Sequence, residues 1–173
     1  MSDDIFDNFL KDCEKKYEED REDSINRIVS GMLDGYITLD NPSPINGMDT
    51  FKQVVLFQLG DVEESEYRSF SLDIVNLFQE RYENLEKGGT DCVIEPIYDL
   101  SEIEKESKKL ISKLAKSVLR ERVTDDNPSK FNNLTSLEQM IFIFFDCSNE
   151  IEMLIVKNKI LARVLDSLLR INS

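Results

Sequence analysis

The chain of 173 residues carries 21 basic and 35 acidic side chains, a formal net charge of −14, and no histidine. This length can bury a hydrophobic core, and a hydrophobic content of 40% excludes a wholly disordered chain. The longest uninterrupted apolar run, 140–145, is far shorter than the ~20 residues that span a bilayer, which excludes a transmembrane helix.

The first predicted element is one long helix over 4–33, in which apolar residues recur at three- and four-residue steps. Nearly every residue in 14–23 is charged, so the alternative is two helices that meet near 20–24. Two prolines and an Asn-Gly pair follow, and they predict a loop over 36–49.

The middle of the chain predicts two further helices and a connector. The apolar run at 50–59 fits a short buried helix or a strand, and we interpret it as a helix. Residues 61–87 place apolar side chains on one broad helical face, and Gly88-Gly89 ends that helix. The β-branched segment 92–98 contains Pro96, which favours an extended connector or a short edge strand.

Two capping boxes predict the starts of the next helices. In Ser101-Glu-Ile-Glu104, the serine hydroxyl and the glutamate carboxylate can each accept a hydrogen bond from a backbone amide at the helix start. The helix that follows carries an apolar face and a basic face. Thr135-Ser-Leu-Glu138 is the second capping box, and it opens the most apolar part of the chain, 137–145.

The last predicted element is a strongly amphipathic helix over 150–171, either continuous with the preceding helix or separate from it. No segment is recognised as recurring at a fixed period. These elements predict an all-α bundle of about five to seven amphipathic helices, with a hydrophobic centre supplied by 137–169. We expect one helical domain over 1–173, of which 1–34 is a candidate semi-independent N-terminal helix.

The residue types exclude several kinds of chemistry. Without histidine, the chain cannot build Ser-His or Cys-His nucleophile pairs or histidine-based zinc sites. The glycines form neither a dinucleotide fingerprint nor a phosphate loop. Cys13, Cys92 and Cys147 are widely spaced, which is typical of reduced, mostly buried thiols that fill a core. We therefore expect no catalytic residue, no cofactor, no metal ligand and no enzymatic activity.

Charge is segregated along the chain. Residues 105–122 contain seven basic and two acidic side chains, a local charge of +5, within a chain that is otherwise acidic. This basic face could bind phosphate groups, but the simpler interpretation is internal pairing with the acidic segments 1–34 or 61–104. The densest acidic cluster, Glu63, Glu64 and Glu66, lacks the spacing of a calcium loop and is typical of a solvated helix start.

These patterns predict a small acidic protein that binds other proteins and is not an enzyme: an adaptor, an assembly factor or an inhibitor of a basic partner. The leucine-rich C-terminal helix is the expected docking element. The candidate partner-binding residues are Lys105, Lys109, Lys113, Lys116 and Arg120, then Glu63, Glu64 and Glu66, and finally Leu161, Leu165 and Leu168.

The expected partner is a protein with a basic or apolar surface, with self-association into a homo-oligomer as a further expectation. Nucleic acid and membranes are not expected partners. The acidic N-terminal residues lack the basic and apolar stretches of a secretory signal, which favours a cytoplasmic location. Two alternatives stay open: a nucleic-acid mimic that occupies a phosphate-binding groove, and an enzyme that uses clustered carboxylates with a divalent metal.

Overall fold

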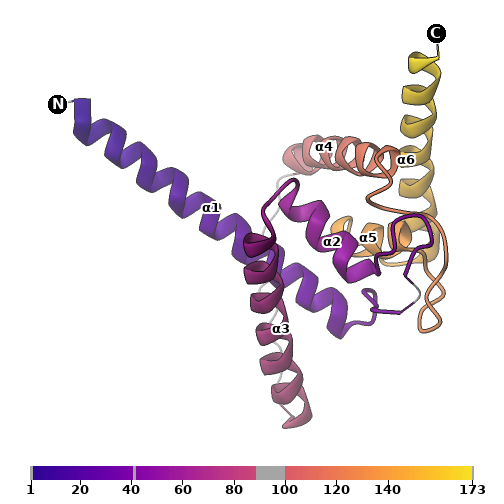
Figure 1. Cartoon of the computed structure of the whole chain (residues 1–173), viewed down its shortest axis with the longest axis horizontal. Coiled ribbons are helices and arrows are strands. Elements are labelled where there is room, and N and C mark those ends of the chain that lie inside the picture. The colour runs from indigo at the N-terminus through magenta and orange to yellow at the C-terminus, as the bar shows by residue number, and fades with distance from the viewer. Residues whose placement is uncertain (1, 41, 89–99, 173) are drawn as a thin grey trace.

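A computed structural model describes residues 2–40, 42–88 and 100–172, and within these residues it contains six helices and no strand (Figure 1). The prediction of an all-α fold with five to seven helices is confirmed. The helices are α1 (Ser2–Leu33), α2 (Thr50–Leu59), α3 (Glu64–Glu86), α4 (Leu100–Leu119), α5 (Ser136–Phe144) and α6 (Glu150–Ile171). The expected extended segment at 92–98 lies outside the described residues.

Local capping explains where several helices begin. Asp49 and Asn149 each accept a hydrogen bond from a backbone amide in the first turn of α2 and α6. The predicted capping box of Thr135 and Glu138 is present at the start of α5. By contrast, α4 begins at Leu100, one residue before the predicted cap, and the side chains of 101–104 lie outside the described part of the chain.

The structure overturns the expectation that no segment recurs. The pattern Thr-x-Asp-Asn-Pro-Ser-x-x-Asn stands at 38–46 and again at 124–132, and the two copies are displaced by 86 residues. At this displacement α1, α2 and α3 correspond in order to α4, α5 and α6. Left-handed backbone conformations recur in step: Gly35, Gly47 and Gly60 correspond to Glu121, Asn133 and Asp146. The chain therefore consists of two similar halves, α1–α3 and α4–α6.

The two halves repeat their internal hydrogen bonds as well. In the first half, the Asn46 side chain accepts from the amide of Met48 at 2.9 Å, and Gln53 Nε2 donates to the Met48 carbonyl at 2.9 Å. The second half has the same contacts at the equivalent positions, from the amide of Leu134 to Asn132 at 2.9 Å and from Gln139 to the Leu134 carbonyl at 3.0 Å. A shared loop geometry therefore precedes α2 and α5.

The same glutamine and asparagine side chains also form reciprocal hydrogen bonds with the opposite half. Gln139 Oε1 accepts from the amide of Thr38 at 3.0 Å, and the equivalent Gln53 Oε1 accepts from the amide of Thr124 at 3.0 Å. Likewise, Asn46 donates to the carbonyl of Glu121 in the other half, and Asn132 donates to that of Gly35. Each loop is thus completed by groups from the opposite half, so the two halves interlock.

The hydrophobic core is assembled from both halves. Seven buried apolar residues of the first half correspond to seven of the second; the pairs are Ile28 and Leu114, Val29 and Ala115, Ile37 and Val123, Val54 and Met140, Val55 and Ile141, Phe57 and Ile143, and Ile74 and Ile160. The expected hydrophobic centre over 137–169 is therefore only partly right. Its buried residues end at Ile160, whereas Leu165, Leu168 and Leu169 are exposed.

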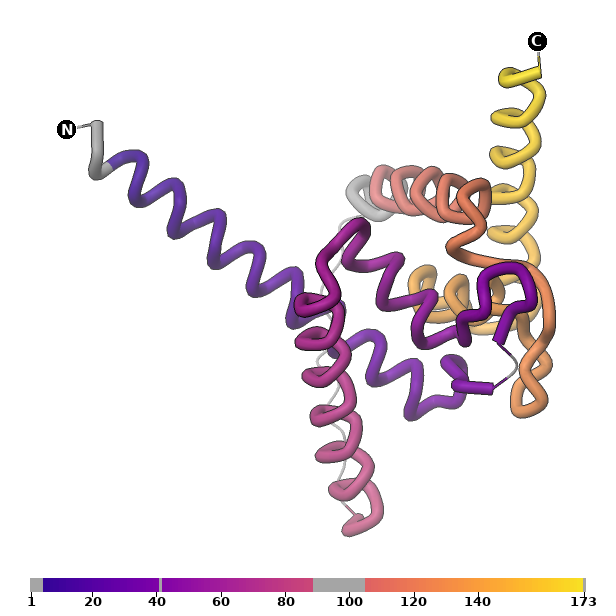
Figure 2. The backbone as a smooth tube through the Cα atoms, in the orientation of Figure 1, coloured from indigo at the N-terminus to yellow at the C-terminus, as the bar shows by residue number. Residues whose placement is uncertain are grey.

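Parts of α1, α3 and α6 extend well beyond this core. The smooth trace in Figure 2 shows the N-terminal part of α1 and the C-terminal parts of α3 and α6 projecting away from the body of the molecule in different directions. The projection of α1 arises because α1 begins at Ser2, whereas α4 begins at Leu100, the position equivalent to Glu14. Residues 2–13 of α1 therefore extend past the region that the two halves share.

Candidate interaction surfaces

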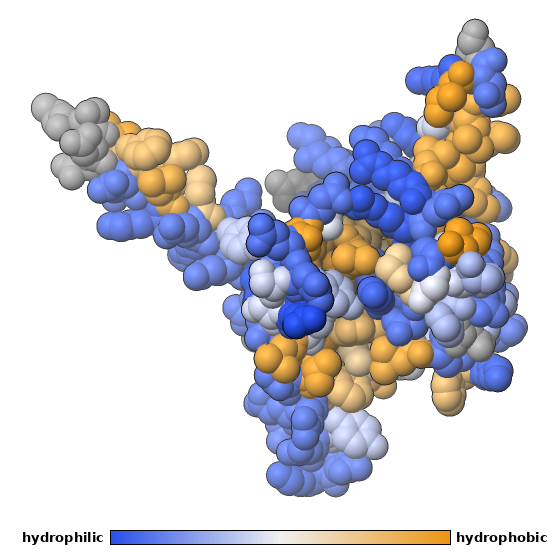
Figure 3. Space-filling view, in the orientation of Figure 1, coloured by the Kyte–Doolittle hydropathy of each residue, from blue (hydrophilic) through white to orange (hydrophobic). Residues whose placement is uncertain are grey.

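The projecting part of α1 carries an exposed apolar stripe. Phe6 and Phe9 are each 61% exposed. The members of this α1 stripe recur at helical spacing and are Ile5, Phe6, Phe9, Leu10 and Tyr17. Figure 3 shows apolar residues along one edge of this helix and hydrophilic residues along the other. A solvated stripe of this size, carried on a helix, is a typical element for docking to another protein.

The base of this projecting helix is fixed to α3. The Tyr17 hydroxyl donates to Glu66 at 3.1 Å, and this hydrogen bond raises the pKa of Tyr17. One turn further along, Arg21 forms an ion pair with Asp73 at 2.5 Å, and its guanidinium lies 5.2 Å from the centre of the Phe70 ring. The stripe is therefore presented by a helix whose direction is set by contacts in the folded body.

Acidic side chains surround the α1 stripe. Residues 5–23 contain eight acidic and four basic side chains, a local charge of −4. The bases are interleaved with the acids; for example, Lys15 lies 3.8 Å from Glu19. The acidic character of this helix is therefore distributed along its length.

The second apolar surface lies on α6. Leu165 and Leu169 are 57% and 60% exposed, and apolar residues follow α6 to its C-terminal end in Figure 3. The members of this α6 stripe are Ile151, Leu154, Ile155, Leu165, Leu168 and Leu169. The predicted docking residues Leu165 and Leu168 belong to it, whereas Leu161 is half-buried and packs against the core.

The equivalent helix α3 shows that the fold does not require the α6 stripe. The α3 residues at the positions equivalent to the stripe are Ser65, Arg68, Ser69, Gln79, Tyr82 and Glu83. Five of these six residues are polar, although α3 packs on α1 much as α6 packs on α4. The apolar side chains of the α6 stripe therefore serve something other than the packing that the two halves share.

Helix α4 packs against α6, and its basic face is largely exposed. Lys105, Lys109, Lys116 and Arg120 are exposed, and no acid among the described residues lies within ion-pair distance of them. Within the described part of the chain, the expected internal pairing is seen at Arg122, which forms an ion pair with Asp61 before α3. The cluster of bases on α4 is therefore an exposed positive surface.

An open groove of about 920 Å³ runs between α1 and α4. Asp20 and Asp23 line it from α1, Lys109 and Lys113 line it from α4, and Phe144 contributes from α5. The acidic and basic helices thus share a groove without closing an ion pair across it. Within the groove Lys113 Nζ lies 4.3 Å from the centre of the Phe57 ring, and burial lowers the pKa of Lys113.

The predicted acidic cluster lies at the start of α3, as expected for a solvated helix start. Glu63 precedes the first residue of α3, Glu64 forms an ion pair with Arg68 at 2.5 Å, and Glu66 accepts the hydrogen bond from Tyr17. Among the described residues, no three His, Cys, Asp or Glu side chains are grouped so that they could hold a metal ion. Glu64 and Glu66 thus each make a structural contact, whereas the Glu63 side chain makes no capping hydrogen bond.

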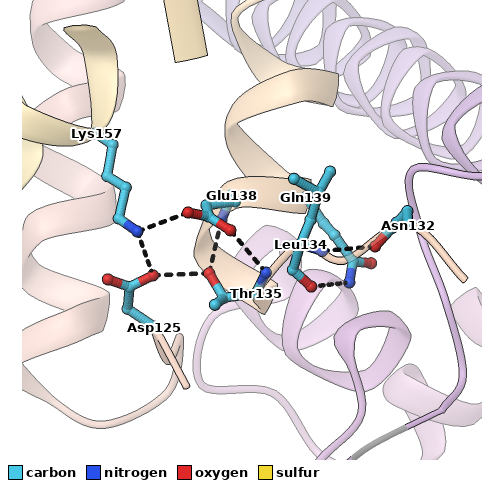
Figure 4. A network of polar contacts seen from close by, with 7 residues as sticks. All are labelled: Asp125, Asn132, Leu134, Thr135, Glu138, Gln139 and Lys157. Atoms are coloured by element: carbon cyan, nitrogen blue, oxygen red, sulfur yellow. Dashed lines mark hydrogen bonds and ion pairs between the residues drawn. The ribbon is translucent and has the colours of Figure 1, made fainter. Parts of the chain in front are cut away.

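A partly buried ion-pair network that the sequence did not reveal joins α6 to α5. Lys157 Nζ lies 2.8 Å from Asp125 and 2.7 Å from Glu138, and the Thr135 hydroxyl donates to Asp125 at 2.7 Å (Figure 4). The equivalent positions in the first half are Ser71, Leu39 and Lys52, so the network exists only in the second half. It therefore fixes the base of α6, as the contacts of Tyr17 and Arg21 fix α1.

The cysteines differ from the expectation of mostly buried thiols. Cys13 is exposed on α1 beside the apolar stripe, and Cys147 is half-buried before α6. Burial, together with the charges of Glu152 and Asp146, raises the pKa of the Cys147 thiol. Cys92 lies outside the described residues. The exposed position of Cys13 shows that its place in the helical pattern does not imply a core role.

No known family model matches the chain, and no similar protein is found among curated proteins or among solved structures. None of the described helices combines the length and the apolar content that crossing a membrane requires.

Proposed function

We propose that this protein is a non-enzymatic interaction protein that binds another protein through the α1 stripe. The observation that carries this proposal is the exposure of Phe6 and Phe9 on a helix that extends past the folded body. Leaving two phenylalanines in water has a free-energy cost, and burying them in a partner would recover it. Aromatic side chains at helical spacing are typical anchors for a groove on a partner surface.

The charge of the helix specifies the rest of the partner surface. Since the α1 stripe is flanked by acids with a local charge of −4, we propose a partner whose apolar groove is rimmed by basic residues. A basic partner also fits the net charge of −14 of this protein, because attraction between opposite charges would speed their encounter. An adaptor, an assembly factor and an inhibitor of a basic protein all act through an interface of this kind.

The test begins with the intact protein as bait and ends with a purified partner. A captured partner is purified, and its dissociation constant is measured by titration against the intact protein and against the variant Phe6→Ser/Phe9→Ser. We expect the variant to bind at least about 30-fold more weakly, because truncating two aromatic anchors commonly costs about 2 kcal/mol or more.

Phe131→Ser is the matched control for this experiment. Phe131 is 82% exposed, but it lies in the loop before α5, far in sequence from the α1 stripe. The Phe131→Ser variant should bind the partner as tightly as the unchanged protein does. Raising the salt concentration should weaken the complex, because screening reduces the attraction between the acidic helix and a basic rim. Equal binding by all three proteins would reject the proposal.

A further inference from the structure

We propose that the α6 stripe is the interface of a homodimer in which two α6 helices form a short parallel coiled coil. The α6 stripe belongs to a seven-residue repeat in α6 that also includes Asn158, Leu161 and Ala162. Its first positions are Ile151, Asn158 and Leu165, its fourth positions are Leu154, Leu161 and Leu168, and its fifth positions are Ile155, Ala162 and Leu169. Three such repeats fill α6, and apolar residues at the first and fourth positions are the pattern of a coiled coil.

The single polar residue in this pattern points to a second copy of the same chain. Asn158 is exposed and occupies the central first position, between Ile151 and Leu165. An asparagine at one first position is a known device that specifies a parallel two-stranded register, since the two side chains can hydrogen-bond to each other across the seam. In a parallel dimer of α6, Asn158 would meet its own copy.

The folded body of the molecule does not cover the side of α6 that would pair with a second copy. Ile160 and Met153 are buried on the side of α6 that faces the core. Leu165 lies five residues after Ile160, which places it roughly 140° further around the helix axis. The stripe therefore faces away from the core, and of the repeat's fourth positions only the central one, Leu161, is half-buried against it. Ile151 and Leu154, near the start of α6, are also exposed, so the body does not cover the beginning of the seam.

The local charges of α6 and α1 favour binding of a second copy of the chain at α6 and of a different protein at α1. Two copies of a chain with a net charge of −14 repel each other, but residues 150–171 contain four basic and three acidic side chains, a local charge of +1. The α6 helices can thus approach without strong like-charge repulsion, whereas two copies of the acidic α1 helix cannot. At the α3 positions equivalent to the first and fourth positions of this repeat, Leu72, Val75 and Tyr82 are apolar and exposed. The polar residues Ser65, Arg68 and Gln79 interrupt that row, so α6 carries the more continuous apolar seam.

Sedimentation of the full chain over a range of concentrations tests the proposal. We expect a species of twice the 20.1 kDa chain mass, whose stability increases with salt because screening weakens the repulsion between the bodies. The variant Leu165→Glu/Leu169→Glu should be monomeric. Its control is Gln79→Glu, which introduces a glutamate at the α3 position equivalent to Leu165 and should leave the dimer intact. Circular dichroism checks that each variant keeps its helices.

Cross-linking tests the register. In a chain whose three native cysteines are replaced by serine, Ile151→Cys should form a covalent dimer on oxidation, because two residues near the same end of α6 face each other only in the parallel arrangement. A chain that stays monomeric at all concentrations, or a dimer that Leu165→Glu/Leu169→Glu leaves intact, would overturn the proposal. A dimer in which Ile151→Cys fails to cross-link would overturn the parallel register. Because these variants do not touch the α1 stripe, their outcome is independent of the function proposed above.

Discussion

Thr50 and Ser136 are the first residues of α2 and α5, and their hydroxyl groups share a hydrogen bond of 3.1 Å. They occupy the same position in the two halves, 86 residues apart. Contact between equivalent residues, combined with reciprocal contacts between the two halves, indicates an approximate two-fold axis that passes between Thr50 and Ser136. The reciprocal contacts of Gln53 and Gln139 lie on either side of this axis, so the body is built like a dimer fused into one chain.

Replacing Gln139 by alanine should destabilise the protein by about 2–4 kcal/mol, which lowers the melting temperature by roughly 5–15 °C. The substitution removes the acceptor of the Thr38 amide and one of the two donors to the Leu134 carbonyl, which keeps its hydrogen bond from the Ser129 amide, and it opens a space in the core. Gln53→Ala should have a similar effect, because its contacts are equivalent. Gln79→Ala, on the exposed face of α3, should change the free energy of unfolding by no more than about 0.5 kcal/mol. Thermal and urea denaturation measure all three variants.

Neither half should fold alone. A fragment of residues 1–88 lacks the Gln139 side chain that completes its loop, and it exposes core residues such as Val54 and Val55. We expect the fragments 1–88 and 99–173 to show no cooperative thermal transition separately and to recover one when mixed. Circular dichroism of each fragment and of the mixture makes the comparison. A cooperative transition in 1–88 by itself would show that the contacts across the axis are dispensable.

Substituting Lys157 by methionine should destabilise the protein by about 1–3 kcal/mol, because Asp125 and Glu138 would be left as neighbouring carboxylates without their shared cation. Glu138 is only 14% exposed in its side chain, so water cannot replace the lost ion pair fully. Lys159→Met, two residues away on the exposed surface of α6, is the control and should be nearly neutral. If both variants unfold at the same urea concentration, the network does not stabilise the base of α6.

The same network predicts how stability depends on pH. Burial would raise the pKa of Glu138, but hydrogen bonds from Lys157 and from the amide and hydroxyl groups of Thr135 outweigh it and lower the pKa. A carboxyl group with a lowered pKa stabilises the fold above its unfolded pKa of about 4.3, and this contribution is lost as the pH falls through the folded value. The free energy of unfolding should therefore decrease below about pH 4.5, and less steeply in Glu138→Gln than in the unchanged protein.

The pKa of Lys157 shifts in the opposite direction to that of Glu138, so its contribution to stability is lost at high pH. Burial would lower the pKa of Lys157, but its contacts with Asp125 and Glu138 raise it. Its contribution is complete below the unfolded pKa of about 10.4 and is lost as the pH rises through the folded value. Urea denaturation at a series of pH values measures both limits. A slope in the acid range that Glu138→Gln does not change would contradict the assignment to this carboxyl group.

Local signals in the sequence predicted much of the fold, because helix starts depend on residues close together in the chain. The capping box of Thr135 and Glu138 is an example, since both partners lie within four residues. The repeat was visible in the polar pattern at 38–46 and 124–132, but it is a single duplication of half the chain. Core replacements such as Val54 by Met140 hide the duplication in a search for regular periods.

The candidate surfaces were harder to predict. The pattern of α6 has apolar residues on two faces, and only the packed structure shows that the face of Ile160 is buried while that of Leu165 is solvated. Similarly, the basic face of α4 was expected to pair with an acidic helix, but α4 packs chiefly on α6. Which helices become neighbours is decided by contacts far apart in sequence, which periodicity does not encode.

Hydrogen exchange on the complex with the purified partner shows which surface the partner covers. In the free protein, amides of residues 5–13 lie on the projecting part of α1 and should exchange quickly. Binding at the α1 stripe should slow their exchange strongly and leave α2 and α5 in the interlocked core unchanged. Slowed exchange elsewhere on the molecule, with residues 5–13 as fast as in the free protein, would show that the partner does not bind at the α1 stripe.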